Sequence, residues 1–216
     1  MYLWNKEFPI DEKKKVCFSM IMIGPRKSGK SFMIKHLLAT SLKKRFDQII
    51  VFSTMEGLKF YRQFIPGKML YDGYKEDIIE KVRTINAKRK KPFNILVIMD
   101  DTNSKKQKYN SSIQSLYTNG RHSQISVIYC AQMAQLTDNS WKSNSDIILI
   151  FDVDTTRARE YVVRNLLSGV IKNKYFDRIS DEERYYMNIL RKVTEEKHRA
   201  LVLLPLDHEL YHYKIG

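Results

Sequence analysis

The chain has 216 residues, 43% of them hydrophobic, which is enough for one domain with a sizeable core and excludes more than two small domains. Its apolar runs stay well below the ~18–20 residues of a membrane-spanning helix, and its first residues lack the apolar core of a secretory signal, so we expect a soluble, intracellular protein with no transmembrane segment. The formal net charge of +14 favours a polyanionic partner, with nucleic acid first.

The first predicted strand covers residues 16–23 (VCFSMIMI), an apolar, β-prone run typical of a buried parallel strand. It leads directly into a complete G-x-x-x-x-G-K-S phosphate-binding loop at residues 24–31, and apolar residues follow at helical spacing over 31–44. Strand, loop and helix N-terminus together form an anion site; the alternative is a Gly-rich turn that binds nothing. The predicted nucleotide-binding residues are Gly24, Pro25, Arg26, Lys27, Ser28, Gly29, Lys30, Ser31 and Phe32.

Each fixed position of this loop has a physical role. Gly24 and Gly29 permit the tight turn that brings backbone N–H groups close to a phosphate. Lys30 can reach the β- and γ-phosphates of a nucleotide, and Ser31 can ligate Mg²⁺. The loop therefore predicts a nucleoside triphosphate and Mg²⁺ as ligands.

The rest of the chain alternates between strand and helix patterns. Further strands are predicted at 48–53, 69–71, 94–99, 125–131, 146–151, 199–204 and, as an edge strand, 209–215. Further helices are predicted at 56–64, 75–89, 111–117, 155–167 and 181–196. Because most of these strands are unbroken apolar runs, we expect an α/β fold of the RecA-like P-loop NTPase class, with a mainly parallel central sheet between two helical layers. The two cysteines, Cys17 and Cys130, are interpreted as reduced thiols in strands.

A second motif, NILVIMDD at residues 94–101, is a hydrophobic strand that ends in two acids, which is a Walker B pattern. Asp100 is predicted to hold the Mg²⁺ that Ser31 also contacts. Asp101 is the candidate catalytic base, which accepts a proton from the attacking water or orients it. The alternative is that both acids cap a loop.

The adjacent acids, with an extra strand between the two motifs, point away from small GTPases and towards the additional-strand ATPases that include RecA-like motors. The sequence also lacks an Asn-Lys-x-Asp guanine-reading motif. We therefore expect ATP as the nucleotide.

Gln132 follows the predicted strand at 125–131 and so lies at its carboxyl end. In a parallel sheet that end is on the same edge as the phosphate-binding loop. An amide there can sense the γ-phosphate or hold the attacking water; the alternative is a surface glutamine.

Arg121 precedes the same strand and so belongs to the opposite edge of the sheet. A strand over 125–131 spans roughly 20 Å at about 3.3 Å per residue. Arg121 is therefore predicted to act in trans, as an arginine finger on the ATP of a neighbouring copy in a ring. A structural salt bridge and a DNA contact are the alternatives, and Arg157 and Arg159 are rival candidates for the finger.

Three segments, GPRKSGKS, VIMDD and NGRHSQISVIYCAQ, together resemble the FtsK–HerA superfamily of P-loop ATPases. Within that superfamily the chain most resembles the genome-packaging ATPases of large double-stranded DNA viruses, of the poxvirus type. An Arg-His pair (Arg121, His122) before an Ile-Ser-rich strand, together with the paired acids, carries this narrower resemblance.

The resemblance covers about residues 17–151, and the C-terminal stretch of about 65 residues matches no family that we can name. We expect one P-loop ATPase domain over 1–216, with a motor core at about 16–152 and a C-terminal elaboration at about 153–216. Asp101 stands where cellular relatives usually have Glu, which is a departure from their pattern.

The resemblance implies an ATP-hydrolysing motor that translocates double-stranded DNA and packages a viral genome into a preformed capsid. It implies a homo-oligomeric ring, a pentamer or a hexamer, with viral capsid or portal-vertex proteins as partners. The expected location is the host cytoplasm at the site of virion assembly, with the virion itself as a second location. The basic loop at Lys105–Lys108 is a candidate DNA-facing element, although a solvated charge run fits equally.

Three alternatives stay open at this point. One is another DNA translocase or a conjugation-type P-loop ATPase, and a second is a nucleotide kinase, for which no Arg-rich lid is evident. The third is a nucleotide-gated DNA-binding module that does not hydrolyse ATP. Turnover stimulated by DNA distinguishes the motor from the last two.

Overall fold

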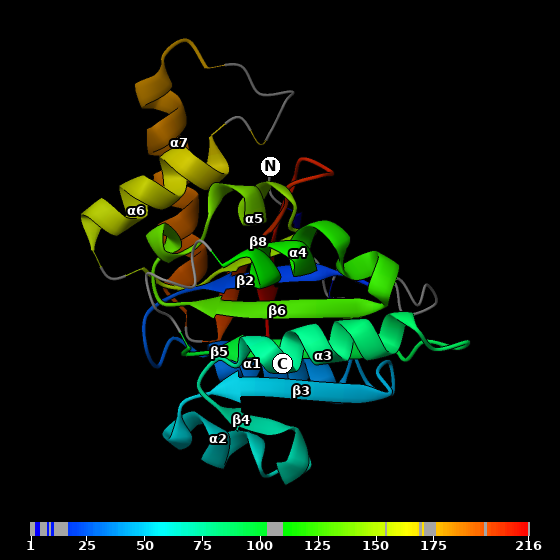
Figure 1. Ribbon diagram of the computed structural model, residues 1–216. Coiled ribbons are helices and arrows are strands. Elements are labelled where there is room, and N and C mark those ends of the chain that lie inside the picture. The colour runs from blue at the N-terminus through cyan, green and yellow to red at the C-terminus, as the bar shows by residue number, and fades with distance from the viewer. Residues whose placement is uncertain are drawn as a thin grey trace.

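The computed structural model describes residues 3–4, 8, 10, 17–102, 110–153, 155–168, 170, 176–196 and 198–215. Nine strands in these residues form one sheet in the order β1-β9-β8-β7-β2-β6-β5-β3-β4 (Figure 1). The strands are β1 (Leu3–Trp4), β2 (Ser19–Ile23), β3 (Gln48–Ser53), β4 (Leu70–Asp72), β5 (Ile95–Asp100), β6 (Ile125–Ala131), β7 (Ile147–Ile150), β8 (Arg199–Leu204) and β9 (Glu209–Lys214). The α-helices are α1 (Lys30–Ala39), α2 (Met55–Tyr61), α3 (Glu76–Ala87), α4 (Ser111–Asn119), α5 (Asn139–Ser143), α6 (Thr156–Val162) and α7 (Ile179–Thr194).

The centre of the sheet is parallel, from β4 through β3, β5, β6 and β2 to β7. Ile23 at the end of β2 pairs with Ala131 at the end of β6, and Asp100 at the end of β5 pairs with Cys130. The segments that follow these three strands therefore leave the sheet side by side at one edge, which we call the carboxyl edge. The arrowheads of β3 and β6 in Figure 1 point towards it.

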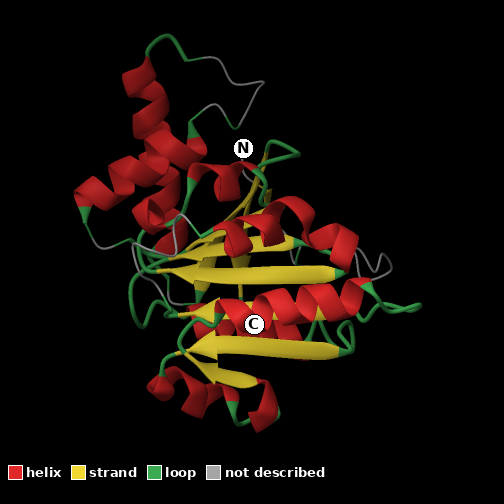
Figure 2. Ribbon diagram, in the orientation of Figure 1, coloured by secondary structure: helices red, strands yellow, loops and turns green. Residues whose placement is uncertain are grey.

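Helices cover both faces of the sheet (Figure 2), as expected for strands that are apolar on both sides. On one face, Met33, Ile34 and Leu37 of α1 pack in a buried cluster that also includes α2. On the other, Ile113 of α4 and Trp141 of α5 belong to a second cluster that continues into α6 and α7. The predicted α/β architecture with two helical layers is confirmed.

Strand β8 runs opposite to the parallel core, and β9 reverses direction again. β8 pairs antiparallel with β7, and β9 pairs antiparallel with β8. The reversal brings the beginning of β8, and His198 just before it, to the carboxyl edge. The prediction that 209–215 forms an edge strand was wrong, because β1 pairs with the other side of β9 in parallel.

The other element predictions agree with the structure apart from their ends. Helix α1 stops at Ala39 instead of residue 44, since the chain turns there and Lys44 adopts a positive φ of 57°. The helix predicted at 155–167 is α6 followed by a π-helical turn at Val163–Leu167. Cys17 and Cys130 are both free thiols, but only Cys130 lies in a strand, because β2 begins at Ser19. The basic loop Lys105–Lys108 lies outside the described residues.

Candidate functional site

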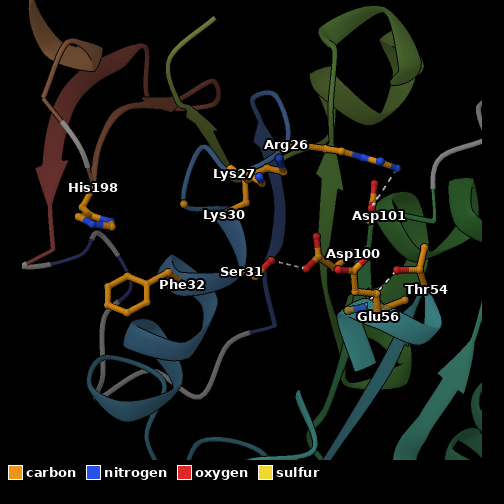
Figure 3. A pocket seen from close by; sticks show the side chains of 13 residues that line it. Arg26, Lys27, Lys30, Ser31, Phe32, Thr54, Glu56, Asp100, Asp101 and His198 are labelled. Carbon is orange, nitrogen blue, oxygen red and sulfur yellow. Dashed lines mark hydrogen bonds and ion pairs between the residues drawn. The ribbon is translucent and has the colours of Figure 1, made fainter. Parts of the chain in front are cut away.

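A cleft of about 450 Å³ lies at the carboxyl edge (Figure 3). The phosphate-binding loop and the start of α1 form one wall, the ends of β3 and β5 with the start of α2 form another, and His198 closes one end. Its lining residues are Arg26, Lys27, Gly29, Lys30, Ser31, Phe32, Ser53, Thr54, Glu56, Gly57, Asp100, Asp101 and His198. The two sequence motifs therefore face one shared space.

Steric constraints explain why the first residue of the loop, Gly24, is a glycine. The N–H of Gly24 donates to the carbonyl of Ala131 at 3.0 Å, which fixes the loop to the end of β6. A Cβ atom at Gly24 would lie 2.7 Å from Ser28 Oγ and 2.8 Å from Phe151 Cβ, so a larger residue would force the loop to move. Gly29 has a φ of 100°, a conformation that glycine adopts without steric cost.

Lys30 begins α1 and is buried, with 8% of its surface exposed. Its Nζ donates to the carbonyl oxygens of Gly24 at 2.6 Å and Pro25 at 2.7 Å. The ammonium group is thereby held over the loop, at the N-terminus of a helix whose dipole also favours an anion.

Ser31 and Asp100 meet as predicted. Ser31 Oγ donates to Asp100 Oδ2 at 2.6 Å, and the two side chains come from different elements, α1 and β5. A hydroxyl and a carboxylate are hard oxygen ligands of the kind that Mg²⁺ takes alongside nucleotide phosphates and water. The donor set therefore fits Mg²⁺.

Asp100 has a second partner that sequence reasoning missed. Tyr61, fully buried at the end of α2, donates its hydroxyl to the same Oδ2 at 2.7 Å. Burial, and then the charge of Asp100, raise the pKa of Tyr61 well above its usual value, so the hydroxyl remains a donor at neutral pH. No sequence motif identifies Tyr61 as a site residue, because its contact with Asp100 depends on how α2 packs against the sheet.

Asp101 and Gln132 also come together. Gln132 Nε2 donates to Asp101 Oδ1, while Arg26 approaches Asp101 Oδ2 at 3.5 Å. Asp101 has a φ of 56°, so the chain turns sharply after Asp100 and places two successive carboxylates at the cleft. The predicted water-positioning pair is therefore assembled within hydrogen-bonding distance, and Arg26 of the phosphate loop reaches it.

The wall formed by α2 adds further polar groups that the sequence did not single out. Thr54 caps α2 by accepting a hydrogen bond from the N–H of Gly57 at 3.2 Å, and Glu56 is exposed in the first turn. Ser53 Oγ at the end of β3, and Ser28 Oγ in the predicted phosphate-binding loop, are buried and have no hydrogen-bond partner among the described residues. Unsatisfied hydroxyls beside this cleft fit a site that binds a polar ligand.

Arg121 lies where the strand direction predicted, in the turn Gly120–Ser123 before β6, at the amino edge of the sheet. Its guanidinium pairs with Asp146, and its side chain remains 59% exposed. Asp146 also accepts hydrogen bonds from the backbone N–H and the hydroxyl of Ser19. The structure thus separates Arg121 from the cleft of its own chain by the length of β6. Of the rival arginines, Arg159 pairs with Asp152 at 3.6 Å and Arg157 is exposed on α6.

Residues 5–205 match the family model of the poxvirus A32 protein. The chain belongs to the poxvirus A32 family. Among relatives, it is 24% identical over 209 residues to DNA packaging protein OPG160 of Variola virus, covering 92% of this chain and 73% of that protein. It is 25% identical over 162 residues to uncharacterized protein 015R of Frog virus 3, covering 72% of this chain. The chain spans 50% of the length of that protein and 64% of protein 088R of Invertebrate iridescent virus 3.

Solved structures of P-loop ATPases share the fold of this A32 family member. The genome packaging NTPase B204 of Sulfolobus turreted icosahedral virus 2, in complex with ATPγS, superposes with a TM-score of 0.66 at 18% identity, covering 92% of this chain and 97% of that one. The pCW3 conjugation coupling protein TcpA, with ATPγS, gives a TM-score of 0.62 at 16% identity and covers 93% and 60%. None of the helices in the described part of the chain is long and apolar enough to cross a membrane.

Proposed function

We propose that this protein is an Mg²⁺-dependent ATPase motor that translocates double-stranded DNA into a preformed viral capsid. The observation that carries the proposal is the shared cleft, in which the phosphate-binding loop faces Asp100, with Asp101 and Gln132 beside it. The family and the packaging role named for the Variola virus relative support viral DNA as the substrate.

In this proposal the residues of the site divide into groups that bind the phosphates, the metal ion and the attacking water. The backbone of residues 24–29 and Lys30 bind the phosphates, with Lys30 exchanging its carbonyl partners for phosphate oxygens. Ser31 and Asp100 would hold Mg²⁺, which neutralises charge on the β- and γ-phosphates when bound. Asp101 takes or orients the proton of the attacking water, and Gln132 fixes the Asp101 carboxylate.

In the proposed ring, a second positive group reaches the cleft from a neighbouring copy, in addition to Arg26 of the same chain. In a homo-oligomer of five or six copies, Arg121 at the amino edge of one copy reaches the cleft of its neighbour and stabilises the transition-state charge. The pairing of Arg121 with Asp146 is exposed enough to exchange for such a partner. The capsid or portal vertex is the proposed docking partner, in host cytoplasm at virion assembly or within the virion.

We also propose that residues 1–216 act as one P-loop ATPase domain with a motor core at about 16–152. The continuous sheet supports this, because β8 and β9 extend the core strands. The fold shared with TcpA supports a second candidate, a DNA translocase of the conjugation type, which would use the same cleft without a capsid.

Phosphate release from ATP, with and without double-stranded DNA, tests the proposal in the wild type, Asp101→Asn and a control, Asp77→Asn. Asp77 is an exposed acid on α3 that pairs with Lys81 and does not line the cleft. We expect DNA to stimulate the wild type and the control, and Asp101→Asn to bind ATP while turnover falls by about 10²–10⁴-fold, the usual contribution of a general base. ATP binding without phosphate release in any of the three proteins, on DNA or with the assembled capsid, would instead support a non-hydrolysing module.

A further inference from the structure

An aromatic pair forms the end of the cleft that the phosphate chemistry does not use. The rings of Phe32 and His198 lie 5.1 Å apart between centroids, at an interplanar angle of 45°. Both residues line the cleft, and in Figure 3 they lie together on the side away from Asp100 and Glu56. The pair joins the first turn of α1 to the segment before β8, two regions far apart in the sequence.

The two side chains are accessible, and the backbone that carries His198 has a defined conformation. Phe32 is 46% exposed, one of few large apolar side chains in the described residues that remain so open. His198 adopts a positive φ of 63°, and its carbonyl accepts a hydrogen bond from the N–H of Ile215 at 3.1 Å. Its Nδ1 lies 3.6 Å from the position of a Cβ atom on Gly29, so the ring leans over the end of the phosphate loop. An exposed phenyl ring beside an exposed imidazole leaves an apolar surface for a planar group.

The direction of a bound nucleotide follows from the opposite end of the cleft. Lys30 and Ser31 fix the phosphates, and Asp100 and Asp101 mark where the terminal phosphate and the attacking water belong. The ribose and base must then extend from the loop in the other direction, towards Phe32 and His198. The volume of about 450 Å³ is in the range of small-molecule sites.

We propose that Phe32 and His198 form the base subsite, in which the purine ring of the nucleotide stacks on one or both rings. This inference rests on the nucleotide binding of the proposed function, but not on DNA translocation. The proposed subsite gives the C-terminal elaboration a function, because His198 from this part of the chain lines one end of the nucleotide site. Stacking on an aromatic face stabilises a bound base enough to change affinity by roughly tenfold or more per ring.

Binding of two ligands, ATPγS and inorganic tripolyphosphate, tests the subsite, because only the first carries a base. Titration calorimetry with Mg²⁺ would compare the wild type with Phe32→Ala and His198→Asn; Asn tolerates the positive φ at residue 198 without supplying a ring. Phe32→Tyr keeps an aromatic face. His122→Ala, an exposed histidine at the amino edge, is the matched control.

We expect the wild type to bind ATPγS at least tenfold more tightly than tripolyphosphate. Phe32→Ala and His198→Asn should each lose roughly tenfold in ATPγS affinity with tripolyphosphate affinity unchanged, and Phe32→Tyr and the control should keep the wild-type affinity. Equal losses for both ligands, or full ATPγS affinity in both ring-removing variants, would overturn the subsite. A protein that binds ATPγS through these rings but shows no DNA-stimulated turnover would overturn only the motor.

Discussion

The two edges of the central sheet differ sharply in what they can do. The carboxyl edge gathers Lys30, Ser31, Asp100 and Asp101 in one cleft, each with a defined partner. The amino edge carries Arg121, paired with Asp146 and open to solvent. The first edge has the groups to bind and orient a nucleotide, whereas the second offers an exposed positive charge that the length of β6 separates from the cleft of its own chain.

The distance between the two edges limits what Arg121 can do within one copy. Roughly 20 Å of strand separates the two edges, and no side chain spans that distance. If hydrolysis needs Arg121 at the γ-phosphate, this arginine must come from another copy, and turnover then depends on assembly. Each prediction below changes one edge and leaves the other intact.

The largest effect is expected at the amino edge. Arg121→Ala should lower kcat by about 10³-fold or more, as loss of an arginine finger does, while ATP affinity of the isolated chain stays unchanged. Steady-state phosphate release and ATPγS titration measure the two quantities. Arg157→Ala, which removes an exposed arginine on α6, is the control and should keep turnover.

An experiment that mixes two variants tests directly whether Arg121 acts on a neighbouring copy. Asp101→Asn and Arg121→Ala damage different edges, so a mixed ring contains some interfaces with both groups intact. Turnover should partly recover when the two inactive proteins are mixed and assembled. If Arg121→Ala alone remains active, or the mixture stays as inactive as its components, the finger does not act in trans.

A smaller effect, but on binding, is expected at the carboxyl edge. Lys30→Ala removes the buried ammonium that contacts the carbonyl groups of Gly24 and Pro25. Loss of a charge-assisted contact to phosphate should weaken ATPγS affinity by about 10–100-fold, and turnover should fall with it. Titration of ATPγS against Lys30→Ala and Lys35→Ala, a lysine of α1 that contacts the rings of Phe60 and Phe64, measures the difference. Equal affinity of the two variants would contradict the role given to Lys30.

Tyr61→Phe should produce an intermediate, metal-specific change. The variant keeps the buried ring and removes only the hydroxyl that donates to Asp100. Outer-shell partners of metal ligands usually contribute 10–100-fold in metal affinity, so the Mg²⁺ concentration for half-maximal turnover should rise by about tenfold. Binding of Mn²⁺ to the nucleotide complex, followed by electron paramagnetic resonance, should weaken to the same degree. Tyr71→Phe, in β4, is the matched control, and nucleotide affinity in EDTA should not change in either variant.

Site residues at the carboxyl edge could be predicted from sequence where they end a strand or belong to the segment that follows it. Asp100 ends an apolar strand and Ser31 follows another through the phosphate-binding loop, and the parallel order of these strands brings their ends together. The meeting of Asp101 and Gln132 follows from the same rule. Strand type and strand ends were therefore enough to predict this half of the cleft.

Tyr61 and His198 could not be predicted in the same way. Tyr61 reaches Asp100 only because α2 packs under the sheet, and His198 reaches the cleft only because β8 runs antiparallel to β7. Neither packing angle nor strand direction is encoded in a local pattern of residues. The prediction that β9 lies at the edge of the sheet was wrong for a related reason, since its outer neighbour β1 comes from the other end of the chain.

The smallest effect is expected when the partner of the proposed finger is changed. Asp146→Asn removes the charge that pairs with Arg121 but keeps an oxygen that can accept from Ser19. Since partly exposed ion pairs contribute little, the free energy of unfolding should fall by about 1 kcal/mol or less in urea denaturation. Turnover should stay within a few-fold of the wild type, because a finger that serves a neighbour must leave Asp146 in any case. A loss of turnover as large as that of Arg121→Ala would mean that Arg121 acts through this ion pair as a structural residue, and the contrast between the two edges would then be one of architecture and not of chemistry.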